Sequence, residues 1–366
     1  MRIAARVPGL AAAVSNLGEP AAPTPPSGGL SHSPEEITRP LPGGAILARG
    51  LVQRVILASP RGYCAGVERA VDTVERALEL YGEPVYVRKQ IVHNSHVVRE
   101  LSERGAVFVD SVEDVPEGAT LVFSAHGVAP SVRGASEARG LRTIDATCPL
   151  VTKVHTQARR YADAGYAIVL IGHAGHEEVE GTTGEAPQAI VLVESVADAE
   201  ALEPPQAERL AYITQTTLSV DETHAIVDVL RRRFPHIEGP EKEDICYATS
   251  NRQWAVKELL GEVELLLVIG SLNSSNSNRL VEVAEATGVP AHLIDDAEAI
   301  DDSWFDGVEV VGVTSGASAP ERLVQEVCDW FRRRGVPDVA EHGSVYEDVV
   351  FKLPPELRRS KRPAAA

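Results

Sequence analysis

The stretch Asp145-Ala-Thr-Cys148-Pro149 decides the fold, because it has a counterpart on each side along the chain. The counterparts are Pro60-Arg-Gly-Tyr-Cys64-Ala-Gly66 and Asp244-Ile-Cys246-Tyr247. Cys148 follows Cys64 by 84 residues and precedes Cys246 by 98. Each cysteine comes before a stretch with helical character that runs into a glycine, at 67–81, 152–164 and 251–260. We therefore take the cysteines as the origins of three repeats.

Further features recur at similar distances from each cysteine. About 28 residues on, a strand pattern ends in a polar loop that holds His93, His176 or Ser274. A strand followed by an acidic residue comes next, and another strand then ends near His126, Thr216 or Ser318. Ligands of open parallel sheets bind at the carboxyl ends of the strands. Three such units would therefore gather their cysteines and polar loops around a central cavity.

The apolar runs indicate the fold class. Runs at 55–58, 167–171, 265–269 and 308–313 are mostly continuous, which is typical of strands buried on both faces. Helical stretches follow them, and this alternation predicts parallel sheets. We expect three pseudo-repeated α/β units with parallel sheets around a central cavity, with units at 51–147, 148–242 and 243–340. The segment 177–184 is too rich in Gly and Thr for a long helix, so the second repeat is imperfect.

The two ends differ from the rest of the chain. Residues 1–50 contain small, kinked and flexible stretches with few large apolar side chains, so we expect a disordered extension. Residues 341–366 end in a short basic tail that is expected to be solvated.

Composition and charge exclude several function classes. The net charge of −18 disfavours nucleic acid, so any phosphate site must be local. No apolar run is long enough to predict a membrane span. Only 4 cysteines are spread over 366 residues, which does not suit a secreted disulfide framework. We therefore expect a cytoplasmic protein whose cysteines serve a metal or catalytic role.

The three repeat cysteines are suited to metal binding. A helix N-terminus carries partial positive charge, which favours a thiolate and an anionic cluster. Three thiolates can hold an iron–sulfur cubane and leave one iron open, whereas zinc needs a fourth ligand or water. The spacing alone leaves both metals open. Cys328, on the apolar face of a predicted helix, is expected to lie in the core.

The other loops offer hydroxyls, amides and imidazoles but almost no fixed cations. Such donors at helix N-termini are suited to phosphate oxygens. His173 and His176 resemble metal ligands by their spacing, but in a loop after a strand we favour a role in anion binding. Glu178, expected on a cavity loop, could deliver protons, and Glu177 is expected to point away from the cavity. Neither a Walker A pattern nor an early G-x-G-x-x-G is found, so no nicotinamide cofactor is expected.

With Phe123-Ser-Ala-His126-Gly-Val, Ile171-Gly-His-Ala-Gly-His176 and Thr214-Gln-Thr-Thr-Leu-Ser219, these motifs resemble the 4-hydroxy-3-methylbut-2-enyl diphosphate reductase family, also called LytB or IspH. The resemblance runs from about Arg54 to about Leu357. It implies an α/β trefoil of the three pseudo-repeated units around a central iron–sulfur cluster. This would be one 4Fe-4S cluster on Cys64, Cys148 and Cys246, with an open fourth iron. It also implies reduction of the allylic alcohol to isopentenyl and dimethylallyl diphosphate, the last step of the methylerythritol phosphate isoprenoid pathway.

The resemblance also implies residue roles. Thr216 and Glu178 would contact the substrate hydroxyl and relay protons. The diphosphate would be bound by His93, His126, Ser274, Ser275, Asn276 and Ser318, with His176 close by. Glu177 is a departure, because some relatives carry proline before the catalytic acid. A C-terminal strand near 349–353 is expected to return to the first unit.

Partners and alternatives follow from the same motifs. Because no second cluster, flavin or nicotinamide motif is seen, ferredoxin or flavodoxin is the expected electron donor. A quinolinate synthase-like enzyme would also have three repeats and three cluster cysteines. A non-enzymatic iron–sulfur redox sensor is the third alternative, but it would not need so many phosphate-type donors.

Overall fold

The computed structural model describes residues 52–204, 208–343 and 345–358, which belong to one compact unit. The extension predicted at 1–50 lies outside the described residues, as does most of the predicted basic tail. Among the described residues, no helix is both long and apolar enough to cross a bilayer.

The described strands form three sheets in which every pairing is parallel. The first sheet has the order β3-β2-β4-β5, with strands β2 (Val85–Arg88), β3 (Ala106–Val109), β4 (Thr120–Phe123) and β5 (Arg142–Asp145). The second has the order β7-β6-β8, with β6 (Ala167–Ile171), β7 (Ile190–Val193) and β8 (Leu210–Thr214). The third has the order β10-β9-β11-β1-β12, with β1 (Arg54–Ala58), β9 (Leu265–Ile269), β10 (Ala291–Ile294), β11 (Val310–Ser315) and β12 (Asp338–His342).

The strand orders confirm the threefold repeat. In each sheet, the first strand after the cysteine helix lies between the next two strands of the chain. These first strands are β2, β6 and β9. The order therefore reverses beside the same strand in each unit, and such a switch point is where open sheets bind ligands. The predicted α/β class with parallel sheets is correct.

Each repeat cysteine is the N-cap of a helix, as predicted. The helices are α1 (Ala65–Tyr81), α4 (Pro149–Asp163) and α8 (Tyr247–Leu259). All three begin earlier than the periodicity indicated. Pro149 suits the first position of α4, where its missing N–H costs no hydrogen bond.

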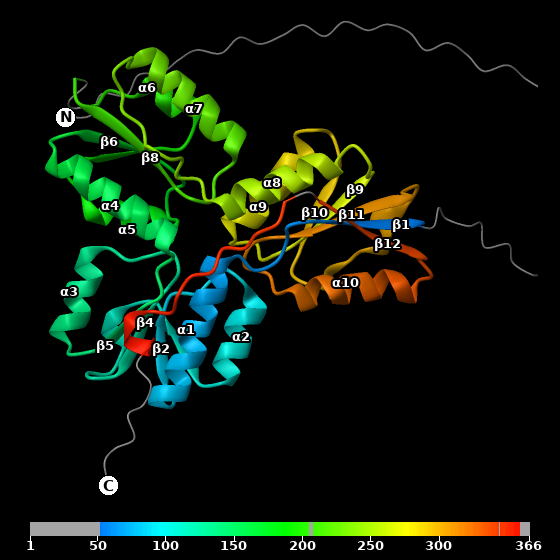
Figure 1. Cartoon of the computed structure of the whole chain (residues 1–366), viewed down its shortest axis with the longest axis horizontal. Helices are drawn as coiled ribbons and strands as arrows, with labels where there is room; N and C mark the ends of the chain where they lie inside the picture. Colours follow the sequence, from blue (N-terminus) through cyan, green and yellow to red (C-terminus); the bar gives the residue numbers. More distant parts are fainter. Residues whose placement is uncertain (1–51, 205–207, 344, 359–366) are drawn as a thin grey trace, which may run out of the picture. The chain divides into compact units, whose positions relative to one another are not determined.

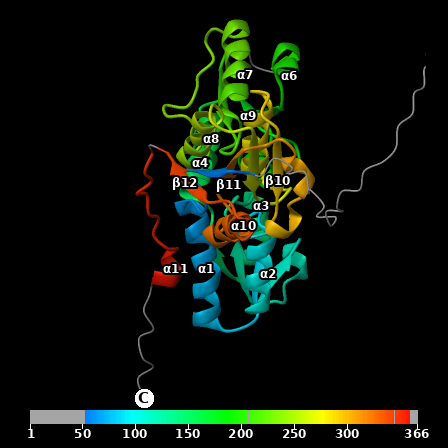
Figure 2. The ribbon, with the colours of Figure 1, turned by 90° about the vertical axis from the view of Figure 1, so that its right-hand side faces the viewer.

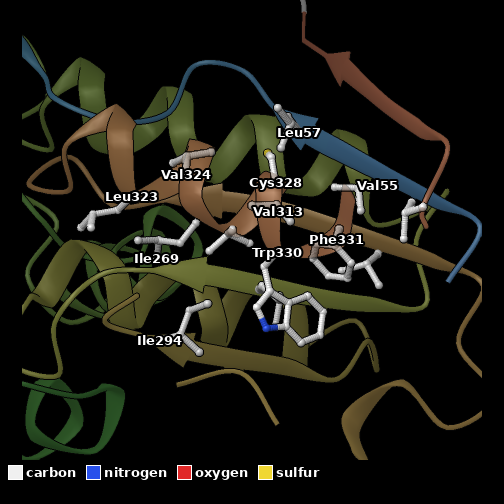
Figure 3. Close-up of a cluster of buried hydrophobic side chains, with 14 of the residues drawn as sticks. Val55, Leu57, Ile269, Ile294, Val313, Leu323, Val324, Cys328, Trp330 and Phe331 are labelled. Atoms are coloured by element: carbon white, nitrogen blue, oxygen red, sulfur yellow. The ribbon is translucent and has the colours of Figure 1, made fainter. Parts of the chain in front are cut away.

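Strand β1 differs from the prediction that placed 51–147 in one unit. It pairs with β11 and β12, so it belongs to the third sheet. Val55 and Leu57 pack in one core with Val313, Leu323 and Phe331, as Figure 3 shows. A continuous apolar strand can pair in any parallel sheet, and its sequence does not specify the partner.

Helices cover both faces of the third sheet. α8 and α9 (Ser275–Glu285) lie on one face, and α10 (Glu321–Arg333) lies on the other (Figure 1). Cys328 of α10 is fully buried in this core, as its position on the apolar helix face predicted.

The C-terminal segment returns to the first unit, but not as the predicted strand. Residues 349–354 have no regular secondary structure and lead into α11 (Pro355–Arg358). Leu357 packs in the core beside Ala70 and Val74 of α1, and Figure 2 shows α11 next to this helix. Arg69 donates a 2.9 Å hydrogen bond to the carbonyl of Lys352. Because the segment packs on a helix, no neighbouring strand pairs its backbone.

The Gly/Thr-rich segment of the second unit forms α5 (Glu177–Glu185), a helix of 9 residues. It is short, as predicted, but so is its counterpart α2 (Ser95–Glu103), also of 9 residues. A Cβ on Gly184 would lie 2.3 Å from that of Ala129, at the start of α3 (Pro130–Ala138). The glycine therefore permits close packing of the two helices.

Candidate active site

One cavity is lined by loops that follow strands of all three sheets. All twelve residues singled out from the sequence line it. They are Cys64, His93, His126, Cys148, His176, Glu178, Thr216, Cys246, Ser274, Ser275, Asn276 and Ser318. The tertiary structure thus brings the predicted site residues together, because the loops at the carboxyl ends of strands in each sheet line the same cavity.

The cysteines enter the cavity from the starts of α1, α4 and α8. A Cβ on Gly66 would lie 2.7 Å from the sulfur of Cys148 and 3.7 Å from that of Cys64, so only glycine leaves room between them. The sulfur of Cys246 accepts a hydrogen bond from the backbone N–H of Thr249 at 3.4 Å. N–H groups at a helix start favour a sulfur that carries negative charge.

Burial opposes that charge. Burial and the neighbouring cysteines raise the pKa of Cys148 to about 12 and that of Cys246 to about 11, although helix-start amides act in the opposite direction. The sulfurs therefore need a positive partner to become thiolates, and a metal supplies one.

The sulfur spacing bears on which metal fits. The three sulfurs do not form a group whose members all lie within 4.8 Å of one another, among the described residues 52–204, 208–343 and 345–358. Ligands of one tetrahedral zinc ion would be about 3.8 Å apart, given a Zn–S distance of about 2.3 Å. The cysteines therefore fit a larger iron–sulfur cluster better than a single ion.

Three histidines form one cluster in the cavity. The rings of His93 and His126 stack with centroids 4.0 Å apart, and His176 meets both edge-on at 5.6 and 5.8 Å. Burial and the neighbouring histidines lower the pKa of His93 to about 2 and that of His176 to about 3. These two rings are neutral near pH 7, and each offers a neutral hydrogen-bond donor.

The third unit contributes a wall of hydroxyls and an amide. Ser274 is the N-cap of α9, and Ser275 and Asn276 occupy its first turn. Ser318 donates a 2.9 Å hydrogen bond to the carbonyl of His93, and Asn276 Oδ1 accepts one of 2.8 Å from the N–H of Ala317. Among the described residues that line the cavity none is Lys or Arg. An anion here would be held by neutral donors and a helix N-terminus.

Glu178 is the buried acid of the site. It is 2% exposed, and its Oε1 accepts a 2.8 Å hydrogen bond from the N–H of Thr216, while Oε2 accepts one of 3.0 Å from the hydroxyl. Burial raises its pKa to about 7, against these hydrogen bonds. Glu178 lies in the first turn of α5 and not on a loop as predicted. His176 caps this helix, because its Nδ1 accepts a hydrogen bond from the backbone N–H of Glu178.

The side chain of Glu177 does not line the cavity, but it does not point into solvent either. Its Oε2 lies 3.2 Å from Nδ1 of His126 and accepts a 3.3 Å hydrogen bond from Ser124. The side chain is only 14% exposed. It contacts a cavity residue without being among those that line the cavity.

Sequence reasoning did not assign two polar residues that line the cavity, Thr217 and Thr249, to the site. The hydroxyl of Thr217 lies 3.1 Å from that of Ser275, so it joins the second unit to the third. Thr249 stands one helical turn after Cys246. Its spacing from the cysteine was the available signal, since residues three apart share a helix face.

A cavity that joins three cysteines to neutral anion-binding donors is typical of enzymes that hold a metal cluster beside an anionic substrate. Comparison with known proteins gives the particular family. The chain belongs to the LytB protein family, whose model matches residues 55–332.

Relatives and solved structures agree with this assignment. The chain is 61% identical over 308 residues to the 4-hydroxy-3-methylbut-2-enyl diphosphate reductase of Acidothermus cellulolyticus. This match covers 84% of this chain and 91% of that protein. The protein of the same name from Streptomyces coelicolor is 56% identical over 315 residues, or 86% of this chain and 93% of its own length. The solved structure of the E-1-hydroxy-2-methyl-but-2-enyl-4-diphosphate reductase from Plasmodium falciparum matches with a TM-score of 0.81 and 39% identity, over 84% of this chain and 97% of that one. Another solved structure of a reductase of this type, described as the terminal enzyme of the non-mevalonate pathway, matches with a TM-score of 0.55 and 32% identity, over 77% of this chain and 100% of that one.

Proposed function

We propose that this chain reduces 4-hydroxy-3-methylbut-2-enyl diphosphate to isopentenyl and dimethylallyl diphosphate. The allylic C–O bond breaks, a C–H bond forms, and two electrons and two protons are consumed as water leaves. The relatives from Acidothermus cellulolyticus and Streptomyces coelicolor are named as reductases of this substrate, and the chain matches most of their length. The observation that carries the proposal is that the three cysteines and the phosphate-type donors of all three units share one cavity.

The cofactor we propose is one 4Fe-4S cluster held by Cys64, Cys148 and Cys246, with the fourth iron open. When bound, it would supply the electrons for the reduction and a Lewis-acidic iron. The spacing of the sulfurs and the room left by Gly66 support this choice.

Substrate binding uses the remaining side chains of the cavity. The diphosphate is bound by His93, His126, Ser274, Ser275, Asn276 and Ser318, with His176 beside it. Hydroxyl, amide and imidazole donors can satisfy phosphate oxygens without a fixed cation. The N-terminus of α9 adds its partial positive charge. Binding energy from the diphosphate orients the allylic hydroxyl, several bonds away.

Protons come from Glu178 through Thr216. A carboxyl with a pKa of about 7 is suited to a general acid, because near pH 7 it carries a proton and can release it. Thr216 holds both carboxyl oxygens, so the acid is fixed in one orientation. We place the substrate hydroxyl next to this pair, where protonation makes water the leaving group.

Electrons reach the enzyme from a small carrier such as ferredoxin or flavodoxin. Such carriers are commonly acidic, and the chain has a net charge of −18, so docking requires a local surface of opposite charge.

Anaerobic reconstitution of the full chain tests the proposal. We expect four irons and four sulfides per chain, a cluster absorption band, and both isomeric diphosphates as products from the allylic alcohol. Quinolinate formation, bound zinc, or a loaded cluster without turnover of the allylic diphosphate would each contradict it.

A further inference from the structure

Glu177 is a partly buried carboxylate that the proposed mechanism does not use. It occupies the first position of α5, directly before Glu178. Its Oε2 faces Nδ1 of His126 at 3.2 Å and the hydroxyl of Ser124 at 3.3 Å. His126 belongs to the loop after β4, so this contact joins the first unit to the second.

We infer that Glu177 is a positioning residue that holds His126 as a cation for binding the diphosphate. The inference rests on the proposed function, because it concerns the same substrate group. With Nδ1–H directed at Glu177, the opposite ring nitrogen Nε2 remains for the cavity that His126 lines. A carboxylate at one edge of the ring stabilises the imidazolium, so Nε2–H becomes a charged donor.

His126 is the suitable histidine of the three. The pKa values of His93 and His176 are held at about 2 and about 3, so neither supplies positive charge near pH 7. Among the described cavity-lining residues there is no Lys or Arg either. His126 has a carboxylate at hydrogen-bond distance, and the charge of His126 in turn lowers the pKa of Glu177, with Ser124 and Arg88 acting in the same direction against burial.

Other charged groups near His126 do not replace Glu177. Glu178 also feels the charge of His126, but its own pKa is about 7, so it is only partly ionised near neutral pH. His93 and His176 oppose the charge on His126, since each has its pKa lowered by that ring. Arg88 acts on Glu177 and stays charged throughout the accessible pH range. Of the other groups in this cluster, Glu178 is therefore the one that also titrates near neutrality.

Two variants remove the carboxylate in different ways. Glu177→Gln keeps the shape, and Glu177→Pro suits the first position of a helix, so α5 is expected to form in both. Glu180→Gln is the matched control, because Glu180 is an exposed acid in the same first turn. The readouts on the cluster-loaded full chain are KM and kcat for the allylic diphosphate, and the inhibition constant of inorganic diphosphate between pH 5.5 and 8.

We expect both Glu177 variants to raise KM and the inhibition constant about tenfold near pH 8, the usual size for loss of charge from a hydrogen bond, with kcat within about twofold. The difference should shrink towards pH 5.5, because an ordinary imidazole is largely protonated there even without a carboxylate partner. Glu180→Gln should match the wild type. In a His126→Gln background, Glu177→Gln should cost nothing further, because its effect passes through the ring.

Several outcomes would overturn the inference. Unchanged diphosphate binding by the Glu177 variants would mean that the carboxylate does not act on binding through His126, and tighter binding would mean that it only repels the substrate. An equal loss in the His126→Gln background would make Glu177 act independently. Ligand atoms of His93, His126 and Glu177 lie within 4.8 Å of one another, so wild-type affinity that requires added Zn²⁺ or Mg²⁺ would assign a metal site instead. If the wild type neither binds inorganic diphosphate nor turns over the substrate, the proposed function fails first.

Discussion

Replacing Glu178 with glutamine tests the proton delivery most directly. The carboxyl is 2% exposed and holds two hydrogen bonds to Thr216. In Glu178→Gln the amide oxygen can accept from the backbone N–H of Thr216, and the amide nitrogen can donate to its hydroxyl. The variant therefore keeps the shape of the site and loses only the acidic proton.

The expected loss of turnover follows from this role. With a pKa of about 7, about half of the wild-type carboxyls carry a proton at pH 7. A positioned general acid contributes about two to four orders of magnitude in rate, so kcat should fall by roughly that factor. This corresponds to roughly 3–5 kcal/mol of transition-state stabilisation, at about 1.36 kcal/mol per tenfold. KM should change little, because the diphosphate is bound elsewhere.

The assay is steady-state reduction of the allylic diphosphate with a chemical reductant, from pH 5.5 to 8.5. In the wild type, kcat should fall as pH rises through about 7, because the acid form is lost. This limb should be absent in Glu178→Gln, and Glu180→Gln on the same helix should behave as wild type. Glu177→Gln is not a suitable silent control, because Glu177 contacts His126. Wild-type kcat and an unchanged pH profile in Glu178→Gln would refute the assignment.

Stability gives a second test of the same group. The folded carboxyl keeps its proton up to about pH 7, whereas an exposed one loses it near 4.5. The folded state therefore binds more protons in this window, and its stability contribution is lost as pH rises from 4.5 through 7. The free energy of unfolding of Glu178→Gln should depend less on pH over that range, as measured by denaturant unfolding. An identical dependence would mean that the carboxyl is ionised in the folded protein.

Four further predictions concern the cluster, the N-terminal segment and the electron donor. Cys64→Ser, Cys148→Ser and Cys246→Ser should each lose the cluster, while the fully buried core variant Cys328→Ser keeps it; a full iron count in any of the first three would remove that residue from the ligand set. Gly66→Ala should lower iron content several-fold, since its Cβ would lie 2.7 Å from the sulfur of Cys148, and normal loading would show that the sulfur can move aside. Deleting residues 1–50, which precede the family match at 55–332, should leave iron content and kcat within error, and a large loss of either would give the segment a role. Reduction by ferredoxin or flavodoxin should slow as salt rises from about 0.05 to 0.5 M, because electrostatic docking is screened, and a rate that ignores salt would exclude such docking.

The sequence by itself determined the repeat and the class of fold. Periodicity and continuous apolar runs are local properties, so the strands at 167–171 and 265–269 and the helices behind the three cysteines could be predicted from their own residues. The candidate site followed from the same repeat, because equivalent loops of equivalent units end at equivalent edges. Their assembly in one cavity is a consequence of strand order, which the repeat already implied.

The tertiary structure alone decided which distant segments pair and which side chains meet. Strand β1 could join any parallel sheet, and only packing against β11 and β12 assigned it to the third. The resemblance implied a strand near 349–353, but the carbonyl of Lys352 accepts a hydrogen bond from Arg69 of α1. Glu177 is a residue of ordinary helix-start type, and its meaning depends on a histidine 51 residues earlier. Such contacts depend on how separate units fit together, and local sequence preferences carry no information about that fit.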